Sequence, residues 1–163
     1  MLRVFRMAAV AAALLVTLGV AAAATLGVGS DLPAITLTDQ HDAKAVIGPD
    51  VRIVVLTRDM AAGDVVKDGF AGMDQAALDL RGAVYVADIG GMPSMVASMF
   101  AIPKMRDRSY RIVLDRDGTA TRDFPYAEGR PTVLLVESGR IARVAQPASG
   151  DELRQLLQPP SQP

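Results

Sequence analysis

The chain of 163 residues contains no cysteine and no tryptophan, and its one histidine is His41. Without cysteine it can form no disulfide framework, no dithiol redox motif, no thiolate zinc site and no iron–sulfur cluster. A single histidine excludes metal sites that combine several imidazoles. The 17 basic side chains nearly balance the 18 acidic ones, for a net charge of −1, so no nucleic-acid partner is indicated. The length suits one domain.

Apolar residues are concentrated at the N-terminus. Arg3 and Arg6 precede a run of small apolar residues that extends to Ala24. A basic start, an apolar stretch and an alanine-rich end are typical of a secretory signal peptide. We therefore expect residues 1–24 to be a signal peptide and the protein to be periplasmic or secreted. The alternative is that the leader is not cleaved and anchors the protein, because the 18 residues from Met7 to Ala24 are just long enough to span a bilayer. This leader is the only membrane link that we expect.

The rest of the chain is predicted to be one domain, residues 25–158, with a short tail. After the leader is removed the chain carries 15 basic and 18 acidic side chains, a net charge of −3, which disfavours anionic partners. The tail, residues 159–163, consists of proline, serine and glutamine and is expected to be disordered.

Strand and helix patterns alternate along the domain. Short apolar runs predict an edge strand at 32–38 and further strands at 51–57, 83–87, 110–114, 131–136 and 141–144. Helical spacing predicts helices at 64–80, from Pro93 to about Ala101, and at 152–157. Gly69 and Gly72 should weaken the first of these helices. Strands separated by helices predict an α/β fold with central parallel strands, and the terminal hairpin makes the sheet mixed.

The order of these elements resembles the thioredoxin fold. Residues 32–40 (LPAITLTDQ) resemble the first segment of peroxiredoxin-like and membrane-tethered thioredoxin-like proteins of the bacterial envelope. Residues 83–117 resemble the peroxiredoxin pattern of a strand, a helix and a D-x-D-G turn, and residues 130–133 (RPTV) match the family's cis-proline segment. The resemblance covers residues 25–158. It implies a thioredoxin-like three-layer sandwich, with a central mixed β-sheet flanked by helices.

The residues that would carry the family's chemistry are absent. In this family the reactive thiols follow the strand matched here by residues 51–57. That place reads RDMAAGD in this chain, and Ala61 and Asp64 occupy the two positions of a C-x-x-C pair. Neither side chain can form a thiolate, so neither can attack a disulfide or a peroxide. The resemblance therefore implies the scaffold without thiol oxidoreductase or cysteine peroxidase activity.

The resemblance also implies a binding groove, because the family lays extended peptides beside its cis-proline. The predicted groove residues are Asp59, Met60, Ala61 and Asp64 on one wall and Arg130, Pro131 and Thr132 on the other. Proline fixes φ and lacks an amide donor, so neighbouring backbone groups stay free for a partner chain. We expect a protein or peptide partner in the cell envelope. The alternative is that Pro131 only shapes the turn.

Other functions remain open on the sequence alone. A thiol-independent enzyme would use Asp59 or Asp64, and an oxidoreductase-associated role is a further alternative. Met92, Met95 and Met99 could offer thioethers to Cu(I), although methionine at helical spacing more often fills a core.

No residues for a tightly bound metal or cofactor stand out beyond these. His41 lies in a turn cluster with acidic neighbours and could join a weak metal site, but a lone exposed histidine is usually only solvated. No G-x-G-x-x-G motif and no P-loop are present. We therefore expect no cofactor.

Overall fold

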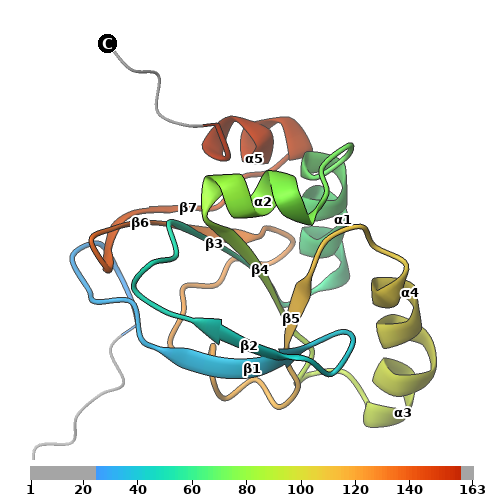
Figure 1. The fold of residues 1–163 in the computed structure, drawn as a ribbon. Helices are drawn as coiled ribbons and strands as arrows, with labels where there is room; N and C mark the ends of the chain where they lie inside the picture. The colour runs from blue at the N-terminus through green and yellow to red at the C-terminus, as the bar shows by residue number, and fades with distance from the viewer. Residues whose placement is uncertain (1–24, 159–163) are drawn as a thin grey trace, which may run out of the picture.

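A computed structural model describes residues 25–158 (Figure 1). The strands are β1 (Ile35–Asp39), β2 (Lys44–Ile47), β3 (Ile53–Thr57), β4 (Ala83–Asp88), β5 (Ile112–Asp115), β6 (Thr132–Glu137) and β7 (Arg140–Ala145). The helices are α1 (Met60–Gly69), α2 (Gln75–Arg81), α3 (Ser94–Val96), the π-helical turn η1 (Ala97–Ala101), α4 (Ile102–Arg106) and α5 (Gly150–Leu156). The predicted signal peptide, residues 1–24, and the tail, residues 159–163, lie outside the described residues. Within residues 25–158, no helix combines the length and the apolar character needed to cross a bilayer.

The seven strands form one mixed sheet in the order β2-β1-β5-β4-β3-β6-β7. The neighbours β3 and β4, and β4 and β5, are parallel, whereas every other pair is antiparallel. All five residues of β3 are buried because the strand lies inside the sheet and both of its faces are covered. The predicted α/β class, with parallel strands at the centre of a mixed sheet, is confirmed.

Two apolar cores lie on the two faces of this sheet. The first contains buried residues from α1, α2 and α5, together with an edge-to-face cluster in which the centroid of the Phe70 ring lies 5.8 Å from that of Tyr85 and 5.1 Å from that of Tyr110. The second lies on the opposite face and includes Phe124 from the loop between β5 and β6, with residues of the β1–β2 hairpin. Figure 1 shows this hairpin below the central strands and α2 and α5 above them. The sheet is therefore enclosed between two packed layers.

Two element predictions were wrong in detail. The predicted edge strand, 32–38, is not at the edge, because β1 pairs with both β5 and the short strand β2. The predicted helix 64–80 is two helices, because α1 ends at Gly69 and the Asp74 carboxylate caps a new helix by accepting a hydrogen bond from the backbone N–H of Ala77. The first helix also begins earlier than expected, at Met60.

Candidate functional site

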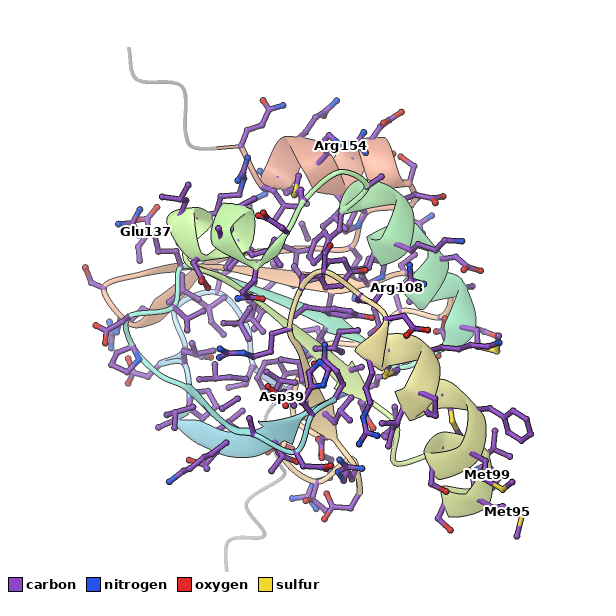
Figure 2. The ribbon with its side chains drawn as sticks, turned by 45° about the vertical axis from the view of Figure 1, so that its right-hand side comes forward. Asp39, Met95, Met99, Arg108, Glu137 and Arg154 are labelled. Atoms are coloured by element: carbon purple, nitrogen blue, oxygen red, sulfur yellow. The ribbon has the colours of Figure 1, made fainter. Side chains whose placement is uncertain are left out.

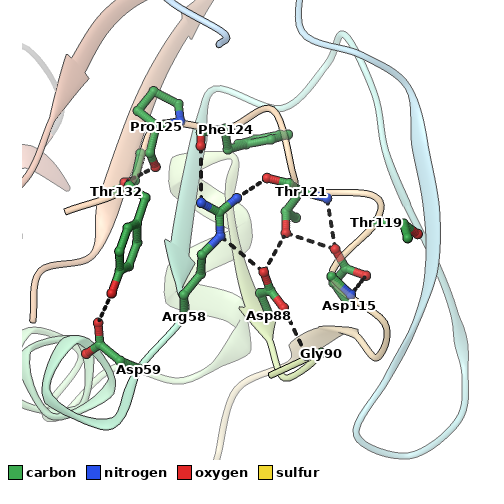
Figure 3. A network of polar contacts seen from close by, with 12 residues as sticks. Arg58, Asp59, Asp88, Gly90, Asp115, Thr119, Thr121, Phe124, Pro125 and Thr132 are labelled. Atoms are coloured by element: carbon green, nitrogen blue, oxygen red, sulfur yellow. Dashed lines mark hydrogen bonds and ion pairs between the residues drawn. The ribbon is translucent and has the colours of Figure 1, made fainter. Parts of the chain in front are cut away.

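Charged side chains meet where the three parallel strands end. Arg58 follows β3, and Asp88 and Asp115 are the last residues of β4 and β5. Figure 3 shows the resulting network. The Arg58 Nε donates to Asp88 Oδ2 at 3.1 Å, and its two terminal nitrogens donate to the backbone carbonyls of Thr121 and Phe124. A partly buried ion pair thus ties β3 and β4 to the loop between β5 and β6.

Thr121 connects the two carboxylates of this network. Its hydroxyl lies 2.8 Å from Asp115 Oδ2 and 3.2 Å from Asp88 Oδ2 and, having one proton, donates to one of them at a time. The fully buried Asp115 also accepts hydrogen bonds from the backbone N–H groups of Thr121 at 2.8 Å and Gly118 at 3.0 Å. Each carboxylate is therefore satisfied. The network fixes the course of the loop over the strand ends.

Asp59 joins the start of α1 to the same loop, an arrangement we call the Asp59 clamp. One carboxylate oxygen caps α1 by accepting from the N–H of Ala62 at 2.8 Å. The other accepts from the N–H of Gly129 at 2.9 Å and from the hydroxyl of Tyr126 at 3.4 Å. Burial raises the pKa of Asp59, but the hydrogen bonds from Ala62, Gly129 and Tyr126 outweigh it and leave the pKa below its ordinary value. The ionised Asp59 is therefore suited to hold the loop rather than to deliver a proton.

Exposed side chains lie next to the clamp. Met60 is 83% exposed and Tyr126 is 53% exposed. The Arg58 guanidinium lies over the Tyr126 ring, 5.7 Å from its centroid, and helps to hold the ring in place. Arg130 is also exposed, and its guanidinium lies 3.4 Å from the carbonyl oxygen of Gln146. We call Met60, Tyr126 and Arg130 the clamp surface.

The structure brings the two predicted groove walls together but changes which residues face the solvent. The clamp joins Asp59 of the first segment to the turn before β6. Pro131 and Thr132 are buried, however, and the Thr132 hydroxyl donates to the carbonyl of Pro125 at 2.7 Å. The exposed Asp64 lies further along α1. Of the predicted groove residues, the exposed ones are therefore Met60, Ala61, Asp64 and Arg130.

The expected cis-proline was wrong, because residues 25–158 contain no cis peptide bond. The turn before Pro131 is closed by a hydrogen bond from the Arg130 N–H to the Ala127 carbonyl, with Gly129 in the left-handed region at φ +71°. From this turn the chain enters β6, where Thr132 pairs with Leu56 of β3. A trans bond suits this extended entry into the sheet.

The weaker metal candidates do not converge. Met92 precedes the first helical residue of α3 and packs against the first core, whereas Met95 and Met99 are exposed and point away from the body of the domain (Figure 2). His41 is exposed in the β1–β2 turn, where its backbone N–H donates to Asp39. Within residues 25–158, no three His, Asp or Glu side chains are placed to hold a metal ion.

The sequence interpretation missed the polar network and Tyr126. A signal for part of it was available: Asp88 and Asp115 each follow an apolar run, and the carboxyl ends of parallel strands meet at one edge of a sheet. No comparable signal pointed to Thr121 or Tyr126, because both lie in the irregular segment between β5 and β6.

Comparison with solved structures defines the class of fold. Similar chains include a peroxidoxin, BcpB, from Mycobacterium tuberculosis, with a TM-score of 0.53 and 15% identity over 81% of this chain and 94% of that one. Another is a putative thiol:disulfide interchange protein, DsbE, from Chlorobium tepidum, with a TM-score of 0.51 and 16% identity over 80% and 94% of the two chains. A third is the thioredoxin domain of a thiol-disulfide oxidoreductase from Bacteroides vulgatus, with a TM-score of 0.51 and 18% identity over 81% of this chain and 96% of that one. The fold is thioredoxin-like.

At these identities the likeness extends to the fold alone. No protein-family model matches the chain, and no curated protein matches it in sequence. The chain has no cysteine, so it cannot perform the thiol chemistry that these proteins are named for. It is a thioredoxin-like domain that is not a thiol redox enzyme.

Proposed function

We propose that the protein is a binding module of the cell envelope that holds an extended segment of a partner protein at the clamp surface. The observation that carries the proposal is the Asp59 clamp. It fixes the start of α1 against the turn before β6 and leaves Met60 and Tyr126 exposed next to it. The envelope location rests on the signal-peptide pattern of residues 1–24.

The clamp surface has the chemistry of a peptide contact. Met60 is flexible and polarizable and adapts to different apolar side chains. Tyr126 offers a large aromatic area, and the contact with Arg58 reduces the entropy that the ring loses on binding. Arg130 adds a cation that suits carboxylates or backbone carbonyls of the partner. The network of Arg58, Thr121 and the two strand-end carboxylates keeps the scaffold under this surface rigid.

Site-specific photocrosslinking in living cells tests the proposal. A photoreactive phenylalanine analogue is placed at position 60 or 126 of the full chain, and at position 80 as a control. Leu80 on α2 is 84% exposed and lies outside the clamp surface. We expect discrete adducts from positions 60 and 126 and none from position 80.

A competition arm identifies the chemistry of the ligand. A permanently unfolded polypeptide, added to an envelope extract before illumination, should reduce the adducts at positions 60 and 126 by competing for the same surface. Adducts of equal yield from all three positions, or adducts that the unfolded polypeptide does not reduce, would contradict the proposal.

A further inference from the structure

The helical segment from α3 to α4 carries an exposed apolar surface that the clamp surface does not include. Met95, Met99 and Phe100 are 69%, 61% and 60% exposed, and Val96 is 43% exposed. Figure 2 shows Met95 and Met99 at the outer end of this segment, directed away from the sheet. We call these four residues the apolar tip. Clustered exposed apolar side chains of this kind mark surfaces that contact another phase or molecule.

The π-helical turn accounts for the outward position of Met99 and Phe100 in the apolar tip. The Ile102 N–H donates to the Ala97 carbonyl, five residues earlier, and both of these residues are buried. The wider turn therefore pushes Ser98, Met99 and Phe100 outward together. Pro103 explains the irregularity, because it has no N–H and its ring crowds the carbonyl of the residue four positions earlier.

The helical segment that carries the apolar tip has basic but no acidic side chains. Residues 89–106 contain no aspartate or glutamate. Lys104 is exposed about one turn after Phe100, so the two lie close on the helix surface. Arg106 lies two residues further along the chain. Its Nε donates to the Gln40 carbonyl at 2.7 Å and its Nη2 donates to the Asp42 carboxylate at 3.1 Å. Asp42 offsets the charge of Arg106, and Asp107 follows it. Because charges more than about 8 Å away are screened at physiological salt, the exposed Lys104 is the cation most available to a ligand at the apolar tip.

We propose that the apolar tip inserts into the surface of an anionic lipid bilayer, with Lys104 at the level of the headgroups. Interfacial helices combine apolar side chains that enter the acyl boundary with cations that contact anionic headgroups. Met99 and Phe100 fit the first role and Lys104 the second, its apolar stem allowing the ammonium to reach the headgroups. The tip projects outward, a shape that suits a fluid bilayer and would require a matching hollow in a protein partner. This contact involves none of the clamp-surface residues.

Vesicle sedimentation tests this proposal with a chain beginning at Thr25, which lacks the leader but contains all seven strands and both cores. We expect binding to mixed vesicles that contain equal amounts of phosphatidylglycerol and phosphatidylcholine. Binding to vesicles of phosphatidylcholine alone should be much weaker. The Met99→Ser, Phe100→Ser double variant should lower the partition coefficient at least about tenfold. The Lys104→Glu variant should lower it by a similar factor on anionic vesicles only.

Matched controls separate this contact from a general effect. Leu80→Ser removes an even more exposed apolar side chain from α2, and Lys44→Glu reverses the charge of an exposed lysine on β2. Both should bind like the unsubstituted chain, and circular dichroism should show that all variants are folded. No binding to anionic vesicles, equal losses in control and test variants, or concentration-dependent self-association that the double variant abolishes without any lipid would each overturn the proposal.

Discussion

Replacing Asp59 by alanine should weaken the fold more than the loss of an ordinary helix cap. The change removes the cap of α1, which costs about 1 kcal/mol. It also leaves the N–H of Gly129 without its carboxylate partner, for a further penalty of about 1–3 kcal/mol. The contact from the exposed Tyr126, at 3.4 Å, adds little. The free energy of unfolding should therefore fall by about 2–4 kcal/mol.

The chain provides a matched control for this experiment. Asp74 caps α2 by accepting from the N–H of Ala77 at 2.9 Å, and no second element is tied to it. Asp74→Ala should therefore cost only about 1 kcal/mol. Urea unfolding of both variants is followed by far-ultraviolet circular dichroism, because the chain has no tryptophan to report by fluorescence. If Asp59→Ala costs no more than Asp74→Ala, the clamp does not hold the loop.

The same clamp has a signature in the pH dependence of stability. The pKa of Asp59 in the folded protein is below its ordinary value, so its ionised form stabilises the fold above the pKa of the unfolded chain. This stabilisation is lost as the pH falls through the folded-state pKa. As the pH is lowered, the unfolding free energy of Asp59→Asn should decrease less steeply than that of the unsubstituted protein. Equal acid slopes would mean that the ionised carboxylate contributes nothing.

Three further changes follow from other contacts. Gly90→Ala should destabilise the fold by about 1–3 kcal/mol in thermal unfolding, because the added Cβ would lie 2.4 Å from the backbone carbonyl carbon of Asp117. Gly91→Ala, where the added Cβ meets open space, should leave the stability unchanged. Arg58→Met leaves the partly buried Asp88 without its cation and should lower the unfolding free energy in urea by about 2–4 kcal/mol; an unchanged midpoint would refute this role. Burial raises the pKa of Tyr85 to about 12, so the stability that its neutral form contributes should be intact below pH 10 and lost as the pH rises toward 12. In a pH titration followed by tyrosinate absorbance, Tyr85→Phe should remove the step at the highest pH.

The central strands were predictable because their burial is visible in the sequence. A run such as Ile-Val-Val-Leu-Thr in β3 has apolar side chains on both faces, which only an interior strand requires. β2 was missed because it has four residues and depends on pairing with β1 across a turn in which Asp42 adopts φ 64°. A short pattern with such a turn carries little information about pairing.

The meeting of the two site segments was predictable from the resemblance, but the clamp was not. Asp59 reads locally as a helix cap, and its second partner, Gly129, is 70 residues away. The burial of Pro131 likewise depends on the pairing of Thr132 with β3, which only the assembled sheet defines. Local patterns therefore indicated which two segments meet and not the side chains that they expose.

Amide NMR spectra recorded during titration with a permanently unfolded polypeptide test the central claim most directly. We expect dose-dependent shifts confined to the backbone amides around the clamp surface, including those of Met60, Gly129 and Arg130, and a loss of these shifts in a Met60→Ser, Tyr126→Ser double variant that stays folded. Shifts that are absent at saturating polypeptide, or that map to another face and persist in the double variant, would contradict the account of this cysteine-free domain as a binding module.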